Sequence, residues 1–225
     1  MPKRSRDGSL KGMAAGRRIP EATVTRLPLY LRVLGEAESD TVSSDELAAR
    51  AGVNAAQVRK DLSYLGSYGT RGVGYDVQYL LRQINRRFGL DAERKVAIVG
   101  LGNLGQALAS YGGFPARGFQ VVAAFDADPS KVGMRVGSTE ILPTSSMSQV
   151  LRDKGVDIAV ITTPASAAQV VADALVEAGV ACILNFAPTT VVVPDQVALR
   201  QVDLGVELQI LSFYRHSGVS TPVGA

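Results

Sequence analysis

The chain of 225 residues has one cysteine, one histidine and no run of eighteen or more apolar residues. A single cysteine excludes an internal disulfide bond. The lack of a long apolar run argues against a membrane-spanning helix. The N-terminal segment, MPKRSRDGSLKGMAAGRR, is basic but has no apolar stretch of the kind that a secretory signal needs. We therefore expect a cytoplasmic protein with no membrane partner.

The cysteine, Cys182, lies in the segment ACILNF, which has the pattern of a buried strand. In such a strand a cysteine behaves as a small hydrophobic residue. A redox-active thiol at this position is the alternative. We expect no metal site.

Positive charge is unevenly distributed along the chain. Residues 1–90 contain 15 Lys and Arg against 9 Asp and Glu, whereas residues 91–225 contain 9 against 12. The N-terminal part is thus the candidate for a polyanionic partner. Six of its basic residues fall in residues 1–18, which we expect to be a disordered tail. The case for nucleic acid therefore depends on where the other charges lie.

Three helices are predicted between about residues 19 and 65. In the first, Pro28 predicts a kink or a fresh helix start. The second has Ser43 as N-cap with Glu46 three residues later, and Gly52 ends it. The third begins with the same device, Asn54 followed by Gln57. Short helices joined by a tight glycine turn are typical of a helix-turn-helix.

The third helix has one apolar face, formed by Val58, Leu62 and Leu65. Small, hydroxyl and basic side chains on the other face suit close approach to a DNA major groove. A plain solvated helix face is the alternative. The residues predicted to point away from the core are Ala56, Lys60, Ser63 and Ser67, with Arg59 on the flank.

The segment GSYGTRGVGYDV follows this helix and predicts a β-hairpin. Its two strands are expected at residues 67–70 and 73–77, around a turn that carries Arg71 and Gly72. A hairpin after a recognition helix is a wing, and its arginine could enter a minor groove. A further helix is expected over YLLRQINRRFGL, followed by a linker at LDAERK.

Beyond the linker the pattern changes to alternating strands and helices. KVAIVG reads as a strand buried on both faces of a parallel sheet, and QVVAAFDADP, VDIAVITTP and VACILNFAP read as three more. Helices are expected over GLGNLGQALASYG, SMSQVLRDKG and SAAQVVADALVEAG. Short loops between alternating elements predict a doubly wound α/β domain.

A glycine motif, G-x-G-x-x-G, stands between the first of these strands and its helix. Gly100 permits the tight turn, Gly102 lets a pyrophosphate approach the backbone, and Gly105 allows close packing of helix on strand. Such a turn directly before a helix is typical of a dinucleotide site.

Asp126 ends the second strand, where a carboxylate can accept hydrogen bonds from the adenine ribose. Because a carboxylate repels a 2′-phosphate, we expect NAD(H) and not NADP(H). Lys131 is the only cation nearby, and we interpret it as a solvated loop residue. A Rossmann domain often belongs to a dehydrogenase, yet the only histidine, His216, is near the C-terminus and no substrate domain follows. An NAD-dependent oxidoreductase is therefore the alternative function, and a non-enzymatic cofactor sensor is favoured.

Several segments resemble the Rex family of redox-sensing transcriptional repressors. They include RLPLYLR, QVRKDLSYLGSYGTRGVGYDV, VGLGNLGQALASY, FDADPSKVG and ILNFAP, and with VDLGVELQILSFY they span residues 26–214 in order. The resemblance implies a homodimer that binds a palindromic operator in double-stranded DNA, either without cofactor or with NAD⁺, and releases it when NADH binds. It also implies a gating role for Tyr111, and nicotinamide-lining loops at Pro164 and at residues 185–188.

The C-terminal segment DLGVELQILSFY fits either a strand or a helix, and it is apolar nearly all round. A last strand of the sheet is one interpretation. The resemblance favours the other, a helix that is exchanged with the partner subunit.

The sequence thus predicts an N-terminal winged helix-turn-helix domain, a doubly wound Rossmann domain and a C-terminal swapped helix. The predicted boundaries are 1–18 for the basic tail, 19–88 for the winged helix, 92–203 for the NAD(H) domain and 204–225 for the dimerisation helix and tail. Residues predicted to contact DNA are Ser43, Ser44, Ala56, Gln57, Arg59, Lys60, Ser63, Tyr68, Arg71 and Gly72. Residues predicted to bind NADH and NAD⁺ are Gly100, Gly102, Asn103, Leu104, Gly105, Tyr111, Asp126, Thr163, Pro164, Asn185, Phe186 and Pro188.

Overall fold

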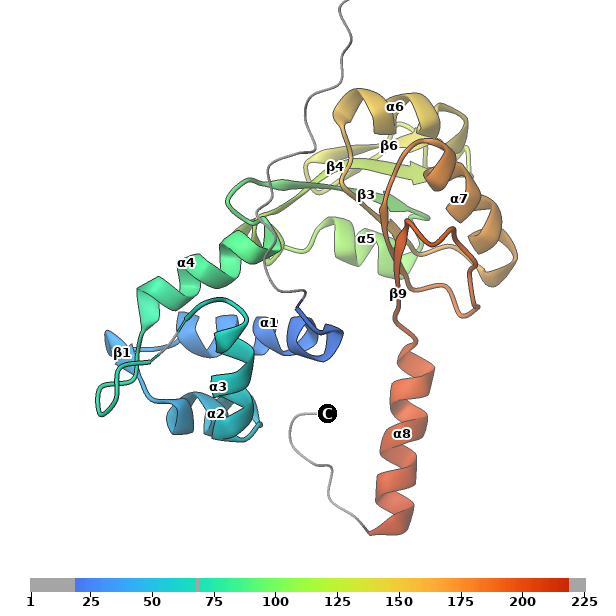
Figure 1. Cartoon of the computed structure of the whole chain (residues 1–225). Helices are drawn as coiled ribbons and strands as arrows, with labels where there is room; N and C mark the ends of the chain where they lie inside the picture. Colours follow the sequence, from blue (N-terminus) through green and yellow to red (C-terminus); the bar gives the residue numbers. More distant parts are fainter. Residues whose placement is uncertain (1–18, 68, 219–225) are drawn as a thin grey trace, which may run out of the picture. The chain divides into compact units, whose positions relative to one another are not determined.

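A computed structural model describes residues 19–67 and 69–218 of the chain. It divides the chain into two compact units, with the boundary between Gly89 and Leu90 (Figure 1). The predicted disordered tail at 1–18 and the end of the chain at 219–225 lie outside the described residues. Over the described part, no helix is long and apolar enough to cross a membrane.

The first unit is a small helical domain with a two-stranded sheet. Ser43 Oγ accepts the Glu46 amide at 3.0 Å and Asn54 Oδ1 accepts the Gln57 amide at 2.8 Å, so both predicted N-caps are confirmed. Gly52 ends the second helix with φ +72°. In chain order the elements are α1 (Glu21–Gly35), β1 (Thr41–Val42), α2 (Ser44–Ala51), α3 (Ala55–Ser63), β2 (Tyr75–Asp76) and α4 (Val77–Phe88).

Helix α1 runs without a break through Pro28, so the fresh helix start considered above does not occur. A proline removes one backbone hydrogen bond from a helix. Leu27, Tyr30 and Leu34 are almost completely buried around it. Burial of this apolar stripe holds the helix together across the missing bond.

The predicted hairpin is wrong in its pairing. Strand β2 pairs antiparallel with β1, Val42 opposite Tyr75, while the segment before it closes on itself by a single bridge between Thr70 and Gly74. Gly72 and Gly74 have φ values of +81° and +97°, which interrupt an extended strand. The result is a short, tight loop with Arg71 exposed at its turn.

A buried carboxylate joins α3 to α1. The side chain of Asp61 is completely buried and accepts five hydrogen bonds. Arg26 donates two of them, at 2.7 and 2.9 Å. The hydroxyls of Thr23 and Tyr30 donate at 2.8 Å each, and the amide of Gln57 donates at 2.9 Å. Every acceptor position of the carboxylate is thus used.

Ser67 was predicted on the outward face of the third helix, and this is wrong. Helix α3 ends at Ser63, and the turns that follow bring Ser67 back into the core, where it is 2% exposed. The predicted apolar face of this helix is confirmed, since Val58, Leu62 and Leu65 are all buried.

The second unit is built on a seven-stranded sheet in the order β5-β6-β4-β3-β7-β8-β9. The strands β6, β4, β3, β7, β8 and β9 are parallel to one another. Strand β5, at the edge, pairs antiparallel with β6. This is the Rossmann order. The strands are β3 (Arg94–Val99), β4 (Phe119–Asp126), β5 (Arg135–Val136), β6 (Thr139–Pro143), β7 (Ile158–Ile161), β8 (Cys182–Asn185) and β9 (Ala198–Gln201).

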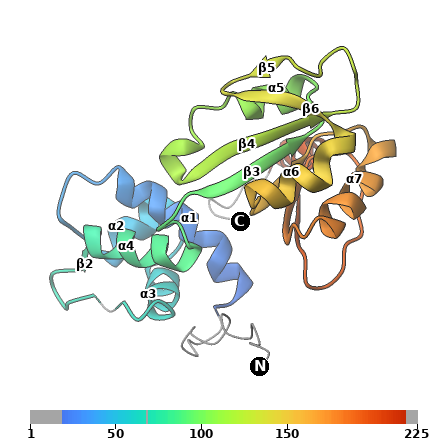
Figure 2. The same cartoon turned by 90° about the horizontal axis from the view of Figure 1, so that it is seen from above.

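Helices cover both faces of this sheet (Figures 1 and 2). Successive residues of β3 alternate between two apolar clusters: Ala97 and Val99 pack with residues of α6 and α7, while Val96 and Ile98 pack on the side of α5. A sheet buried on both faces needs strands that are apolar throughout, as predicted. The helical segments are α5 (Asn103–Ala109), α6 (Met147–Lys154), α7 (Ala165–Glu177), and two short 3₁₀ turns at Pro115–Arg117 and Thr144–Ser146.

Strands β5, β6 and β9 were not predicted, because they lie toward the two edges of the sheet, where few of their residues are buried and no continuous apolar run marks them. Cys182 was predicted to be buried, and this is wrong: it is the first residue of β8 and is exposed. Burial in β8 begins at the next residue, Ile183.

The C-terminal segment is a helix, α8 (Leu204–Ser217), which decides between the two interpretations of its pattern. Asp203 caps it by accepting the amides of Gly205 and Val206. None of its residues is buried by the described part of the chain.

The Asp61 cluster generates a stability prediction. Burial alone would raise the pKa of Asp61, but the hydrogen bonds from Arg26, Tyr30, Thr23 and Gln57 outweigh it and hold the pKa below its ordinary value. Asp61→Ala leaves Arg26 and Tyr30 without their partner, so the first unit should lose about 3 kcal/mol of unfolding free energy. Urea titration followed by hydrogen exchange at α1 and α3 amides measures this loss.

The lowered pKa of Asp61 also predicts how the stability of the first unit changes with pH. A carboxylate whose folded pKa is depressed contributes its full stabilisation above its unfolded pKa of about 3.9, and this contribution is lost as the pH falls from that value through the lower folded pKa. The Asp61→Ala protein should lack this part of the acid sensitivity. Glu36→Ala is the control, because the Glu36–Arg50 pair at 3.1 Å is exposed and should contribute below about 1 kcal/mol. Equal effects of the two changes would contradict the prediction.

Candidate dinucleotide site and nucleic-acid interface

The predicted cofactor residues gather at one edge of the second unit. Gly100 follows β3, Asp126 ends β4, Thr163 follows β7 and Asn185 ends β8. In a parallel sheet the carboxyl ends of the strands lie at the same edge. The strand order reverses between β3 and β7, and ligands of such sheets bind at this switch point.

The turn after β3 is held between its two neighbouring strands. The Gly100 amide donates to Phe125 O on β4 at 2.8 Å, and the Thr162 hydroxyl, just after β7, donates to Gly100 O at 2.6 Å. Gly100 has φ +94°, and a Cβ there would lie 2.8 Å from Thr162 O. This backbone conformation and this crowding both require glycine.

Gly102 and Gly105 differ in what surrounds them. A Cβ on Gly105 would lie 1.9 Å from Gly100 O, so glycine is needed for the start of α5 to pack on the turn. A Cβ on Gly102 would meet no described atom within 4 Å. Gly102 is therefore not required by the fold, and its bare backbone faces open space next to the first amides of α5 (Asn103, Leu104).

Asp126 is tied into the turn by both of its oxygens. Oδ2 accepts the Leu101 amide at 2.7 Å and Lys131 Nζ at 3.0 Å, while Oδ1 accepts the Asp128 amide at 2.8 Å. Burial would raise the pKa of Asp126, but the two amides and Lys131 together lower it, so the group is ionised at neutral pH. Lys131 is therefore an ion-pair partner, and its interpretation as a solvated loop residue is wrong.

Asn185 is fully buried, and its side chain organises the loop after β8. Its Oδ1 accepts the Ala187 amide at 2.9 Å, and its Nδ2 donates to Thr189 O and to Gln201 Oε1. Gln201, on β9, donates in turn to Ala187 O at 2.9 Å. This loop carries Phe186 and Pro188, so the hydrogen bonds of the Asn185 side chain fix the backbone on which these two residues lie.

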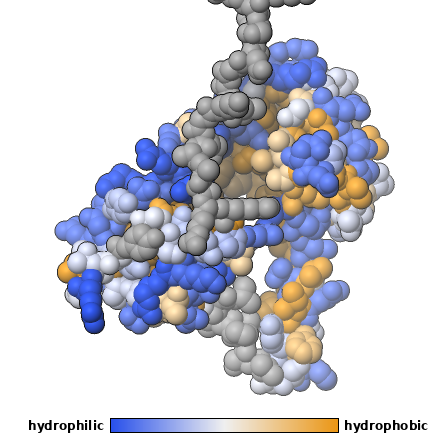
Figure 3. All heavy atoms as spheres, viewed as in Figure 1, coloured by the Kyte–Doolittle hydropathy of each residue, from blue (hydrophilic) through white to orange (hydrophobic). Residues whose placement is uncertain are grey.

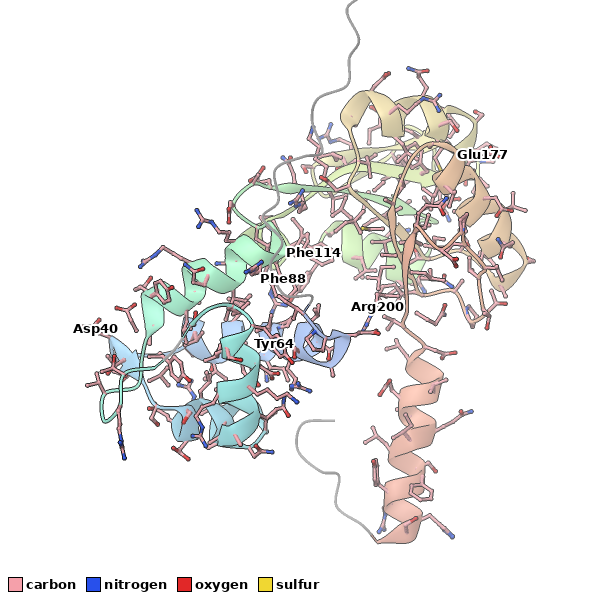
Figure 4. The ribbon with its side chains drawn as sticks, viewed as in Figure 1. Asp40, Tyr64, Phe88, Phe114, Glu177 and Arg200 are labelled. Atoms are coloured by element: carbon pink, nitrogen blue, oxygen red, sulfur yellow. The ribbon has the colours of Figure 1, made fainter. Side chains whose placement is uncertain are left out.

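The other residues predicted to line the nicotinamide are more exposed to solvent than Asn185. Pro164 and Pro188 are exposed, and Tyr111 is half exposed, with its ring against Phe114 at 5.1 Å between centroids. Figure 4 labels Phe114, which precedes the 3₁₀ turn after α5. Thr163 Oγ1 is buried, and among the described residues it has no hydrogen-bond partner. No group of metal ligands occurs in this part or elsewhere among the described residues.

In the first unit, α3 presents the predicted DNA-binding face. Ala56, Arg59 and Lys60 are exposed on the side opposite Val58 and Leu62. Arg59 donates to Ser44 Oγ at 2.8 Å, which links α3 to the start of α2.

Other predicted DNA contacts have internal partners in this structure. Gln57 donates to Asp61, and the Ser63 hydroxyl donates to Lys60 O at 2.7 Å. The oxygen of Ser43 caps α2. Arg71 and Gly72 are exposed in the loop before β2, and Tyr68 lies outside the described residues.

Four residues of these sites were not assigned a role from the sequence. Thr162 and Gln201 follow or belong to strands and had no motif to mark them. Asp61 lies in a helix with many polar residues and was not singled out. Its position beside Val58 and Leu62 on the apolar face is the signal that could have indicated a buried carboxylate. Lys131 was noticed, but its partner across the turn was not.

Two protein-family models match the chain. One, described as "CoA binding domain", matches residues 91–189, and the other, described as "Putative DNA-binding protein N-terminus", matches residues 18–63. The two matches divide the chain as the two structural units do.

Relatives and solved structures are similar over nearly the whole chain. The redox-sensing transcriptional repressor Rex of Streptomyces griseus is 60% identical over 88% of this chain and 79% of its own. The Rex protein of Carboxydothermus hydrogenoformans is 48% identical over 88% and 97%. The crystal structure of RSP in complex with β-NAD⁺ and operator DNA has a TM-score of 0.84, with 36% identity over 90% of this chain and 94% of that one. RSP in complex with β-NADH has a TM-score of 0.80, with 34% identity over 89% and 95%.

The contrast between two glycines generates a prediction. Gly102→Ala should leave the second unit as stable as before, because the new methyl group meets open space. It should weaken NADH binding at least tenfold, since the methyl group takes the place where a pyrophosphate would approach. Calorimetric titration with NADH, and thermal unfolding of the same sample, measure the two quantities.

Gly105→Ala is the matched comparison. Its methyl group collides with Gly100 O inside the protein, so this change should lower the unfolding temperature as well as NADH affinity. Normal NADH affinity in a stable Gly102→Ala protein would place the pyrophosphate elsewhere.

Proposed function

This chain belongs to the Rex family of redox-sensing transcriptional repressors, and we propose that its second unit senses NADH and thereby controls DNA binding by its first unit. It is a repressor and not an enzyme. The observation that carries the proposal is the open backbone at Gly102, between a tightly constrained Gly100 and Gly105, in a chain that also has a helix-turn-helix. We also propose that the protein works in the cytoplasm, where a repressor would meet operator DNA.

In this proposal the pyrophosphate of the dinucleotide binds over Gly102, at the amides of Asn103 and Leu104. Asp126 accepts a hydrogen bond from the adenine ribose, since Oδ1 has one acceptor position left. The nicotinamide extends across the switch point toward Thr163 and Pro164. The "CoA binding" family model is compatible, because coenzyme A and NAD share an adenosine diphosphate group that the same glycine turn can hold.

The residues proposed around the nicotinamide explain a preference for NADH. Tyr111, Pro164, Phe186 and Pro188 carry no charge. Closing such surroundings over NAD⁺ would take a cation out of water without a compensating carboxylate, whereas the dihydronicotinamide of NADH is neutral. A ligand shifts a two-state equilibrium only by its difference in affinity for the two states. NADH should therefore favour the closed state, and NAD⁺ should leave the population largely unchanged.

Helix α8 supports a homodimer. Its large apolar side chains are exposed around the helix, including Leu204 at 60%, Leu208 at 67% and Phe213 at 64% (Figure 3). A helix apolar on all sides needs a partner to cover it. We infer that a second copy of the chain covers α8, and that the two copies exchange these helices.

The loop after β8 offers a route from the cofactor to α8. Asn185 and Gln201 join this loop to β9, and Asp203, two residues beyond Gln201, caps α8. Figure 4 labels Arg200 on β9, next to this connection. A change at the nicotinamide loop thus reaches the dimer helix through directly bonded groups. In the proposed dimer, NADH then moves the two α3 helices out of register with a palindromic operator, whose half-sites lie about one helical turn apart.

DNA binding is proposed for the exposed face of α3, with the loop at Arg71 beside it. The serines at the start of α2, Ser43 and Ser44, would contact phosphates. Ala56 permits close approach to the base edges, and Arg59 and Lys60 supply positive charge.

A charge substitution tests this face. Lys60→Ala should weaken operator binding about tenfold and leave NADH affinity unchanged. If Lys60 contacts a phosphate, binding to random DNA should weaken equally, and the slope of affinity against salt should fall by about one charge. Gel shifts over a salt series measure both. Arg152→Ala, on α6, is the control with the same charge change. Wild-type affinity of the Lys60→Ala protein for both DNAs would remove α3 from the interface.

Thermodynamic linkage provides the test of the sensing function. If NADH weakens DNA binding by some factor, operator DNA must weaken NADH binding by the same factor. Calorimetric titration of NADH into the protein, alone and with a saturating operator duplex, measures that factor. Equal NADH affinities in the two titrations would contradict the proposed switch.

A further inference from the structure

Lys131 and Asp126 form an ion pair at the ribose end of the proposed dinucleotide site. Lys131 Nζ lies 3.0 Å from Asp126 Oδ2, and the lysine side chain is 30% exposed against 10% for the carboxylate. The backbone of Lys131 is held as well, since its amide donates to Asp128 O and its carbonyl accepts the Met134 amide. These backbone hydrogen bonds hold Lys131 in the turn, so its position next to the carboxylate is fixed by the fold.

The ion pair changes how many hydrogen bonds Asp126 can still accept. A carboxylate oxygen has two acceptor positions. Oδ2 uses both, for the Leu101 amide and Lys131, whereas Oδ1 uses one, for the Asp128 amide. While the pair is intact, Oδ1 is the less occupied oxygen, so it is the one that can most readily accept a ribose hydroxyl. The ammonium group, partly exposed beside it, is available to a second oxygen of the ligand.

The pair also changes the charge that a ligand meets. Three charged groups lie together here, Asp126, Asp128 and Lys131, and their sum is one negative charge. Without Lys131 the same place would carry two negative charges. The ordinary argument that a carboxylate after the second strand excludes a 2′-phosphate therefore holds only in part for this chain.

We propose that Lys131 is a specificity-determining residue of the dinucleotide site, which lowers the discrimination between dinucleotides with and without a 2′-phosphate by neutralising Asp126. This inference rests on the proposed function. It concerns the phosphate-bearing end of the ligand, so it is independent of how the nicotinamide end distinguishes NADH from NAD⁺. A repressor built in this way responds to NADH first, and to NADPH at higher concentration.

The decisive experiment compares NADH and NADPH as ligands of Lys131→Met. Methionine keeps the length of the side chain and removes its charge. NADH affinity should fall about threefold or less, because the two backbone amides still hold Asp126 in place. NADPH affinity should fall about tenfold further, because the 2′-phosphate then meets two uncompensated carboxylates. Calorimetric titration of the full-length protein with each ligand measures the ratio.

Two variants and a salt series separate this charge effect from a structural one. Lys131→Arg keeps the charge and should keep the wild-type ratio of NADH to NADPH affinity. Arg152→Met removes a positive charge from the exposed side of α6 and should also keep the ratio. The additional discrimination in Lys131→Met should shrink in about 1 M salt, where the Debye length is about 3 Å. A packing defect would persist at that salt concentration.

The outcomes distinguish this inference from the proposed function. If wild-type protein binds NADH and the Lys131→Met change weakens both ligands equally, Lys131 has no part in specificity and the inference is overturned. A ratio that moves toward NADPH overturns it as well. If wild-type protein binds neither ligand, the proposed sensing function itself fails.

Discussion

The buried carboxylate of Asp61 is the interaction on which the first unit depends. Apolar contacts between α1 and α3 have no preferred direction, so they alone would let α3 rotate or slide by part of a turn. Four hydrogen bonds from Thr23, Arg26 and Tyr30 on α1, with a fifth from Gln57 on α3 itself, hold Asp61 in one orientation. Lys60 precedes Asp61 in the same helix turn and points outward because Asp61 points inward. Asp61 thus fixes the orientation of the face of α3 that is proposed to bind DNA.

The second unit uses backbone proximity for the same purpose. Gly100, Gly105 and Thr162 bring β3, α5 and β7 so close that no side chain fits between the first two. This crowding leaves an opening at Gly102, where the backbone is bare. Asp126 then ties the turn to β4 through the Leu101 amide. The same carboxylate that is proposed to bind ribose also stabilises the turn proposed to bind pyrophosphate, so cofactor recognition and local folding share one group.

The two ends of the proposed cofactor have different physical demands. At the adenine end the proposed determinant is charge: Lys131 lies 3.0 Å from the largely buried carboxylate of Asp126, and the lysine is the more exposed of the two groups. At the nicotinamide end the proposed surroundings are uncharged, so the cost of removing NAD⁺ from water decides. Asn185 and Gln201 connect that second end to α8, whose apolar side chains are not covered by the described residues. In the proposed mechanism, a response to redox state therefore acts on the helix that is proposed to form the dimer.

The sequence by itself determined the features that depend on neighbouring residues. The caps at Ser43 and Asn54, the glycine turn after β3 and the apolar strands at the sheet centre follow from local geometry and from the apolar run in each segment. The position of the glycine turn at the carboxyl edge of the sheet could therefore be predicted, whereas the role of the loops at Pro164 and residues 185–188 stays a prediction from the family resemblance.

Only the tertiary structure decided features that depend on residues far apart in the chain. The pairing of β2 with β1, the helical state of α8, the exposure of Cys182 and the partners of Asp61 and Gln201 belong to this group. A polar side chain can be read from the sequence, but its partner cannot, because hydrogen bonds and ion pairs form between atoms that the fold brings within about 3 Å. For the same reason, the neighbouring Lys131 was visible in the sequence while its contact with Asp126 was not.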